Sequence, residues 1–312
     1  MKKRLLLPVL LLALHLDLFA FAKHGHMATG SLAYQLMSPA DRDAIAAILE
    51  HHPFVSGPWA PLLAAPSSPN ISRGEKLFML AAAWPDEVRS AKWKKKYHHA
   101  TWHYVNLAYS AGAAVPGASI GGDLLKQLPI QLKAAKQATS LEDRAIAICW
   151  LIHQTGDLHQ PLHVVALVND DYPQGDRGGN LFFVKTKPDN SPTYLHALWD
   201  NASPRKYTDF AGVHENAIKL KNDINVPSLP QFTGTKPDAF EAIAKKEGFP
   251  YAAKYAYLNG TLQGATEHEA EEDPDEVPVV PNLYSADVGR VTYSQLALAG
   301  HRIAKLLATV AH

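Results

Sequence analysis

The sequence predicts a mainly α-helical protein with at most a small β-hairpin. Two observations support this class. One short run, residues 181–184, combines the apolar and aromatic residues typical of a strand, and we expect it to form half of a hairpin. By contrast, apolar residues recur at helical spacing over several long segments, namely residues 26–50, 73–84, 123–136, 141–159 and 293–310. No linker-like composition divides them, so we expect one domain.

The first helical segment should be interrupted at Ser38-Pro39, where Ser38 can cap a new helix that begins at Pro39. Residues 53–69 are rich in Pro and Ser and predict a loop. The next helix, residues 73–84, should end at Pro85, because proline disfavours helical geometry in the residue before it.

The segment 141–159 is apolar on nearly every side, which predicts a central, buried helix. Pro161 should stop or kink it. A Gly- and Asp-rich loop follows at residues 170–180, and a short helix begins near Tyr194. Residues 267–281 are acidic and contain prolines, and we expect a mobile loop there before the closing amphipathic helix.

The overall charge is balanced, with 30 Lys and Arg residues against 30 Asp and Glu residues. Proteins that hold nucleic acid through a broad electrostatic surface are basic, so this class is excluded. A nucleic-acid substrate would need local positive charge, such as metal ions. The 16 histidines suggest a metalloprotein, although scattered surface and core histidines would give the same count.

One short basic run is nevertheless present at residues 92–96, with Trp93 and Tyr97 next to its lysines. It is either the solvated face of a helix or a patch that contacts a phosphate backbone.

The N-terminus has the three parts of a secretory signal: a basic start, an apolar run from Leu5 to Leu14, and a small residue at Ala20. We expect residues 1–20 to be a signal peptide and residues 21–312 to be the mature domain. An uncleaved anchor is the alternative, but the apolar run is short for a membrane span. The mature protein would then be secreted or periplasmic, with no membrane anchor.

Cys149 is the single cysteine, so no intrachain disulfide is possible despite the predicted export. It lies in an apolar stretch, where we expect it to be buried as a small hydrophobic residue. Stability must then come from a large core and, where metal is bound, from the metal.

The strongest chemical signal is the segment from His153 to His163. His153 and Asp157 are four residues apart, so on a helix they share one face and can bind one metal ion. His163 lies just after Pro161, where the chain must turn, and can point toward a second ion while Asp157 bridges the two. The alternative is a helix with solvated histidines, but unpaired charge is costly in such an apolar helix.

A second pair with the same spacing is formed by His196 and Asp200. Upstream, Asp86 in Trp-Pro-Asp and His103 in Trp-His-Tyr add one metal-binding side chain each. At the predicted mature N-terminus, the amino group and carbonyl oxygen of Phe21 could chelate a metal with His26. A frayed terminus with incidental histidines is the alternative.

Taken in order, these pieces resemble the S1/P1 nucleases, from about residue 21 to the final helix. The shared order is an N-terminal residue with Gly-His, then Trp-x-Asp, His-aromatic, His-x3-Asp-x5-His and His-x3-Asp. The resemblance implies a helical fold of the phospholipase C/P1 nuclease type, an endonuclease activity and three zinc ions. The implied ligands are Asp86, His103, His153 and Asp157 for the first zinc, His163, His196 and Asp200 for the second, and Phe21, His26 and Asp157 for the third.

The chain departs from the family pattern in three places. Phe21 stands where the family usually has Trp, but the ligand atoms there are backbone atoms. Asn106 stands where an Asp commonly assists the attacking water; it cannot act as a base but could orient that water. The disulfides of plant and fungal members are absent, which resembles a bacterial member.

The resemblance also implies the substrates and further site residues. Single-stranded DNA and RNA would be cut to 5′-phosphate products, and 3′-nucleotides could be dephosphorylated. Asp157, Asn106 and Arg89 would be catalytic, with Arg89 steadying the phosphoryl oxygens, unless it is an ordinary surface arginine. Tyr104 would stack on a base, or is simply a half-buried tyrosine. We expect a monomer without an obligate protein partner.

Two other functions use similar residues. A zinc phospholipase C shares the helical three-zinc plan, but its second zinc motif ends in Glu, whereas His196 is followed by Asp200 here. A non-enzymatic periplasmic zinc-binding protein would also be rich in histidine, but it predicts loose His clusters rather than His and carboxylate residues alternating at helical spacing.

Overall fold

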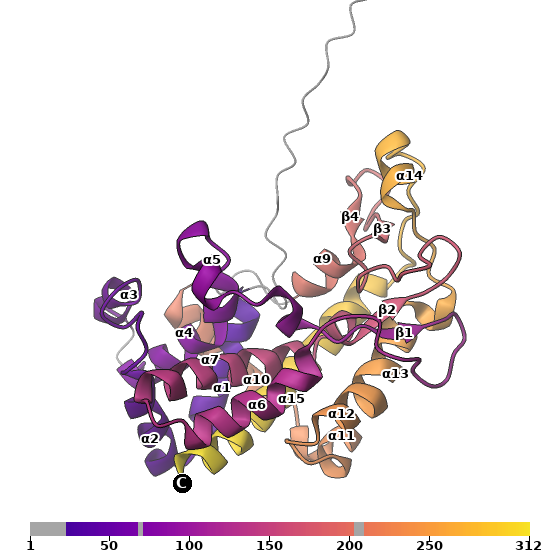
Figure 1. Ribbon diagram of the computed structural model, residues 1–312. Helices are drawn as coiled ribbons and strands as arrows, with labels where there is room; N and C mark the ends of the chain where they lie inside the picture. Colours follow the sequence, from indigo (N-terminus) through magenta and orange to yellow (C-terminus); the bar gives the residue numbers. More distant parts are fainter. Residues whose placement is uncertain (1–22, 68–70, 203–208) are drawn as a thin grey trace, which may run out of the picture.

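The computed structural model describes residues 23–67, 71–202 and 209–312. Most of this chain is helical (Figure 1), which confirms the mainly α-helical class. The helices are α1 (Lys23–Leu36), α2 (Pro39–Leu49), α3 (Ala60–Ala64), α4 (Arg73–Glu87), α5 (Ala91–Tyr97), α6 (Leu124–Gln137), α7 (Leu141–Asp157), α8 (Pro161–Val164), α9 (Leu195–Asp200), α10 (Phe210–Asp223), α11 (Pro230–Gly234), α12 (Phe240–Ile243), α13 (Phe249–Tyr251), α14 (Glu267–Glu272) and α15 (Tyr284–Ala311).

Shorter helical turns connect several of these helices. The 3₁₀ segments are η1 (Ala100–His103), η2 (Val226–Ser228) and η5 (Leu258–Gly260). The π-helical segments are η3 (Ala244–Gly248) and η4 (Ala252–Ala256), which adjoin α12 and α13.

The described strands form two small sheets. β3 (Phe183–Val184) pairs antiparallel with β4 (Thr193–Tyr194), which is the expected hairpin. In addition, β1 (Leu107–Tyr109) pairs in parallel with β2 (Val165–Leu167), with Leu107 opposite Val165. The sequence did not indicate this parallel pair. Each of its strands has only three residues. The two strands lie far apart in the chain, so they can pair only when the protein folds.

The break at Ser38-Pro39 is confirmed, because the Ser38 side chain accepts a hydrogen bond from the Asp41 amide at the start of α2. The expected end of the next helix at Pro85 is wrong: α4 continues through Pro85 to Glu87. A proline this close to a helix end removes a single intrahelical hydrogen bond, and the turn that carries Asp86 still forms.

Three further segments differ from the sequence-based expectation. The loop predicted at residues 53–69 contains α3. The closing helix α15 starts nine residues earlier than the periodic pattern indicated, at Tyr284. The acidic segment expected to be a mobile loop contains α14, where Thr266 and Glu269 form a reciprocal capping box. This cap stabilises a short helix whose apolar periodicity is too weak to detect.

α7 lies in the centre of the fold, as expected. It is capped by Ser140, which accepts a hydrogen bond from the Asp143 amide, and is buried through its last four turns. It packs against α6, α4, α2 and α15, while α1 packs against α4, α10 and α15. Cys149 is fully buried on α7, as predicted. The polar last turn of the central helix therefore lies in the protein interior.

A buried arginine ties the end of α7 to the rest of the fold. Arg302 on α15 makes a bidentate pair with Glu247 at 2.8 and 2.9 Å and also lies 2.9 Å from Nε2 of His159. His159 donates from Nδ1 to the carbonyl oxygen of Thr155. This network holds the turn between α7 and α8, which separates Asp157 from His163.

No helix in the three described segments is long and apolar enough to cross a membrane.

Candidate metal centre

The last two turns of α7 bring His153 and Asp157 to one face, as the spacing predicted. Nε2 of His153 lies 3.3 Å from Oδ2 of Asp157, and both side chains are fully buried. His103 at the end of η1 lies on the same side of Asp157, with its Nδ1 3.2 Å from Oδ2. Asp86 of α4 completes this group, with Oδ1 3.7 Å from Nε2 of His153 and 3.8 Å from Nδ1 of His103. These four residues converge on one small volume.

The other oxygen of Asp157 faces a different histidine. Oδ1 lies 3.3 Å from Nε2 of His26, which is fully buried on α1. The His26 ring stacks on that of His153, with the ring centres 3.9 Å apart. Because its two oxygens face different imidazoles, Asp157 could serve as a ligand in more than one metal-binding group. Phe21, the predicted backbone ligand beside His26, lies outside the described residues.

A third group contains His163 on α8 and His196 and Asp200 on α9. Nε2 of His196 lies 3.3 Å from Oδ2 of Asp200, and the rings of His163 and His196 are 4.9 Å apart. All three side chains are buried. This set is the one that the sequence assigned to a second ion. Within the described residues, three sets of side chains lie close enough together to hold a metal ion: His26, His153 and Asp157; Asp86, His103 and His153; and His163, His196 and Asp200.

Backbone carbonyl groups set the orientation of three histidines. His153 donates from Nδ1 to the carbonyl oxygen of Ala82 at 2.8 Å, His163 to that of His103 at 2.5 Å, and His196 to that of Gly178 at 2.6 Å. A carbonyl oxygen only accepts, so each Nδ1 carries hydrogen and each Nε2 presents a lone pair. This arrangement is typical of metal-ligating histidines.

Burial controls the charge of the site. It lowers the pKa of His103 and of His196 to about 4 and holds those of His153 and His163 well below 6.5, so these imidazoles are neutral at pH 7. Burial also raises the pKa of Asp157 to about 6 and that of Asp86 to about 7, although Arg89 opposes the latter shift. Arg89 lies 2.5 Å from Asp86 and balances part of the negative charge, and a metal cation would supply the positive charge that the neutral imidazoles cannot give to Asp157.

The unsatisfied atoms point to the same conclusion. Nε2 of His163 and Oδ2 of Asp86 are buried and have no hydrogen-bond partner among the described residues. Leaving such atoms unpaired costs about 1–3 kcal/mol each. Imidazole nitrogens and carboxylate oxygens are also the ligands that zinc prefers in proteins. The donor set therefore fits zinc.

A cleft of about 500 Å³ opens onto these groups. Among the residues expected to act there, Arg89, Tyr104 and Asn106 all line it, together with His103, His163 and His196. The guanidinium of Arg89 lies 2.5 Å from Oδ1 of Asp86, so this arginine borders the metal-binding group. Asn106 has a φ of 45°, a left-handed conformation that Asn tolerates better than most residues.

Sequence reasoning missed several residues of this site. His98, Gln174, Arg177 and Asn180 line the cleft, and the last three come from the Gly- and Asp-rich loop, whose composition was the available signal. Gln160 was also missed. Its amide donates to Oδ1 of Asp200 at 2.7 Å and its oxygen accepts from the Leu162 amide, so it fixes α8 against α9.

Comparison with known proteins decides the family. The S1/P1 Nuclease family model matches residues 21–312. The chain belongs to the S1/P1 nuclease family. It is 28% identical to Endonuclease 3 of Arabidopsis thaliana over 213 residues, covering 62% of this chain and 67% of the relative. It is 27% identical to Endonuclease 2 of the same plant over 248 residues, covering 72% and 74%. Membership in the S1/P1 family supports a nuclease, a hydrolase whose substrates are nucleic acids.

Proton release provides a test of the charges in this S1/P1 site. At pH 5, the metal-free protein should hold protons on Asp86 and Asp157 but none on His103 or His196. Loading with zinc should therefore release about two protons from these carboxylates at pH 5 and close to none at pH 8. Calorimetry in buffers with different ionisation enthalpies measures this number. Release of four or more protons at pH 5 would mean that the histidines are protonated.

Gly156→Ala tests the contact between α7 and α1. Alanine normally stabilises a helix by about 1 kcal/mol relative to glycine. Here its Cβ would lie 2.9 Å from Nδ1 of His26, so we expect a net loss of about 1–2 kcal/mol and weaker zinc retention. Urea unfolding and zinc content measure the two effects. Gly289→Ala on α15 is the control, because its Cβ meets no atom within 4 Å; equal effects of both variants would refute the contact.

Proposed function

We propose that the protein is a zinc-dependent endonuclease that hydrolyses phosphodiester bonds of single-stranded DNA and RNA to 5′-phosphate products, and that it also removes phosphate from 3′-nucleotides. The placement of Asp157 carries this proposal. One buried carboxylate faces two histidine-containing groups with its separate oxygens, and a third His/Asp group borders the same cleft. Several metal ions held at one cleft are suited to phosphodiester hydrolysis.

The residues are proposed to bind three zinc ions. Asp86, His103, His153 and Asp157 would hold the first, and His163, His196 and Asp200 the second. The amino and carbonyl groups of Phe21, with His26 and Asp157, would hold the third. Support for the last comes from α1, which begins at Lys23 and buries His26 beside Asp157, five residues after Phe21. The family model also begins its match at residue 21.

This third site has a consequence for export. The amino group of Phe21 exists only after cleavage following Ala20, so the site would be completed when the signal peptide, residues 1–20, is removed. We propose that residues 21–312 form a single catalytic domain that is secreted or periplasmic and acts as a monomer. The lack of disulfides suits a bacterial-type member.

The side chains around the cleft have separate roles in the proposed reaction. Zinc, when bound, would lower the pKa of a water molecule and stabilise negative charge on the phosphate. Arg89 borders Asp86 and lines the cleft, where its guanidinium can bind a phosphoryl oxygen. The amide of Asn106 would orient the attacking water, since it cannot accept a proton as a base. Tyr104 would stack on a base of the substrate.

The burial of the ligands supports the preference for single strands. Asp157 and His153 are fully buried, and His196, which lines the cleft, is 6% exposed, so a phosphate would have to enter the cleft to approach the metal-binding groups. A single strand bends and presents its backbone readily. A duplex is stiff over such lengths, with a persistence length of about 150 base pairs.

The decisive experiment uses the mature protein, residues 21–312, loaded with zinc and incubated with single-stranded DNA, single-stranded RNA and lecithin. We expect chelator-sensitive cleavage of both nucleic acids with 5′-phosphate ends and no cleavage of lecithin. Asp157→Asn should lower the rate more than about a hundredfold, because it disrupts two metal groups. Asp287→Asn, at an exposed position on α15, is the control.

Each other outcome assigns the protein differently. Intact nucleic acid with metal fully bound would refute the nuclease and favour a zinc-binding protein. Lecithin cleavage with intact nucleic acid would assign the protein to the zinc phospholipases C.

Asn106 variants test the orienting role. Asn106→Ala removes one hydrogen bond and should lower kcat about three- to tenfold with little change in KM. Asn106→Asp should retain activity within about threefold, because Asp also tolerates a positive φ and keeps an acceptor. Steady-state kinetics on a dinucleotide measure both. Wild-type kcat in the Ala variant would remove Asn106 from the reaction.

A further inference from the structure

The four lysines of α5 form an exposed basic surface, which we call the α5 lysine face: Lys92, Lys94, Lys95 and Lys96. The chain as a whole is neutral. Between Glu87 and Asp123, however, it contains Arg89 and these four lysines but no Asp or Glu. Positive charge is therefore concentrated on one segment of a chain whose net charge is zero, and a local anionic partner is indicated.

α5 is fixed in place by aromatic side chains, so its lysines have a defined position. Tyr97 is 6% exposed and its ring centre lies 5.3 Å from that of Trp84. The Trp93 ring lies 4.7 Å from Phe54. The ammonium of Lys92 lies 4.6 Å from the centre of the Trp93 ring, a contact that retains its hydrogen-bond donors. These ring contacts attach the α5 lysine face to the hydrophobic core.

The segments on both sides of α5 contain residues that line the cleft. The chain leaves the cleft at Arg89, forms α5 and returns to the cleft at His98, and both of these residues line it. The pKa of His98 is lowered first by burial and then by the positive charges of Arg89 and Lys94. The charge of Lys94 is therefore close enough to act on this part of the cleft wall.

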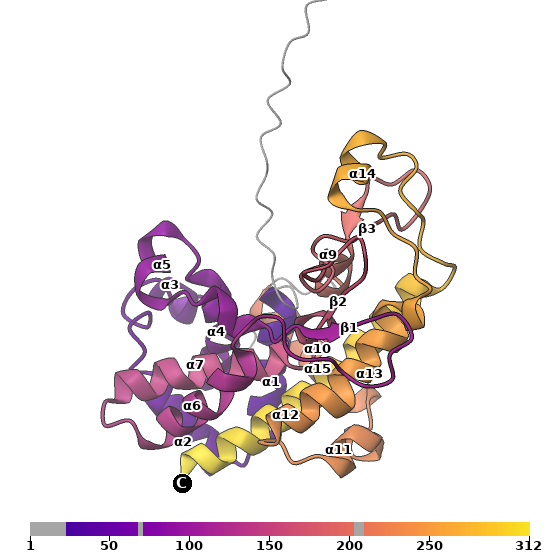
Figure 2. The ribbon, with the colours of Figure 1, turned by 45° about the vertical axis from the view of Figure 1, so that its right-hand side comes forward.

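The opposite side of the molecule carries the opposite charge. Figures 1 and 2 both place α14 across the molecule from α5, with α9 between them in the view. The segment 267–276 around α14 has seven exposed acidic side chains and no lysine or arginine. This asymmetry gives a bound polyanion one favourable direction in which to leave the cleft.

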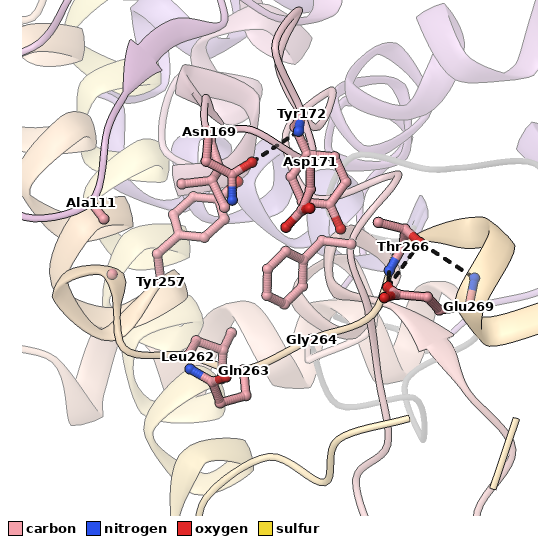
Figure 3. A pocket seen from close by; sticks show the side chains of 13 residues that line it. Ala111, Asn169, Asp171, Tyr172, Tyr257, Leu262, Gln263, Gly264, Thr266 and Glu269 are labelled. Carbon is pink, nitrogen blue, oxygen red and sulfur yellow. Dashed lines mark hydrogen bonds between the residues drawn. The ribbon is translucent and has the colours of Figure 1, made fainter. Parts of the chain in front are cut away.

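A pocket beside α14 shows why a polyanion is not expected to extend in that direction (Figure 3). It has a volume of about 190 Å³ and an aromatic floor that includes Tyr172 and Tyr257, which could accommodate a base. Its rim, however, carries the carboxylates of Asp171 and Glu269. These would repel the phosphate attached to any base, so the pocket does not continue the path of a polynucleotide.

We propose that the α5 lysine face binds the part of a single-stranded polynucleotide that continues beyond the bond being cut. Lys92, Lys94 and Lys95, which are exposed on α5, contact its phosphates. The strand runs from the cleft over α5 and away from α14. This inference rests on the proposed nuclease function and adds to it a binding surface outside the metal centre.

The test compares a 30-nucleotide single strand with a dinucleotide in the zinc-loaded mature protein. The variant carries Lys92→Gln, Lys94→Gln and Lys95→Gln. Each phosphate contact on a single strand contributes about 0.7 to the slope of log affinity against log salt. The loss of three contacts should make the slope of log kcat/KM against log salt less negative by about 2. Between 50 and 200 mM salt, the activity of the wild type should then fall roughly 15- to 20-fold more than the activity of the variant. Dinucleotide cleavage should change less than twofold.

Two control variants, each with three substitutions, separate the effect of where the charge lies from the effect of losing charge. Lys133→Gln, Lys136→Gln and Lys246→Gln remove the same charge from exposed sites that do not line the cleft, and should leave the salt slope unchanged. Lys92→Arg, Lys94→Arg and Lys95→Arg keep the charge and should retain the wild-type slope.

The possible failures are distinguishable. If the wild type cleaves neither substrate, the proposed nuclease function fails. If it cleaves both and the α5 variant keeps the wild-type slope, the inference fails while the function stands. Loss of binding to phosphatidylserine vesicles, with unchanged polynucleotide kinetics, would assign the lysines to a membrane surface and would also overturn the inference.

Discussion

The buried carboxylate of Asp157 is the constraint on which the rest of the site depends. It is fully buried at the end of the central helix, and its two oxygens face different imidazoles. Burial raises its pKa to about 6, so the carboxylate is protonated in mildly acidic solution unless additional positive charge lies nearby. The surrounding histidines are themselves held neutral by burial. A bound metal cation would supply this positive charge, which would account for the many polar side chains in the interior of the helical core.

The scaffold supports this arrangement through its backbone. Carbonyl groups from α4, η1 and the glycine-rich loop each accept a hydrogen bond from a different histidine. Because these carbonyls come from separate parts of the chain, the histidines have the required orientation only when the elements are packed together. Gly156 allows α1 to approach α7 closely enough for His26 to stack on His153. Packing of the core and assembly of the site are therefore one process.

Charge is distributed unevenly over the protein. In the proposed function, the positive charge that holds a polyanion would come from two places, the bound zinc ions and the α5 lysine face. The acidic segment around α14 balances the total. Local charges of opposite sign steer a ligand more strongly in direction than a uniform surface would. The overall amino-acid composition, which is neutral, does not reveal that positive and negative charges are separated in this way.

The sequence by itself determined the features that depend on helical periodicity and local capping. The pairs His153–Asp157 and His196–Asp200 share a helix face because four residues make about one turn, and Ser38 caps α2 through a contact three residues away. Only the tertiary structure decided which residues from distant segments meet. It brought Asp86 and His103 to His153, paired β1 with β2, and placed Arg177 and Gln160 at the site. Local spacing cannot encode these contacts, because they arise from how the helices pack around the core. Even the passage of α4 through Pro85 was settled by packing, which outweighed the cost of one missing hydrogen bond.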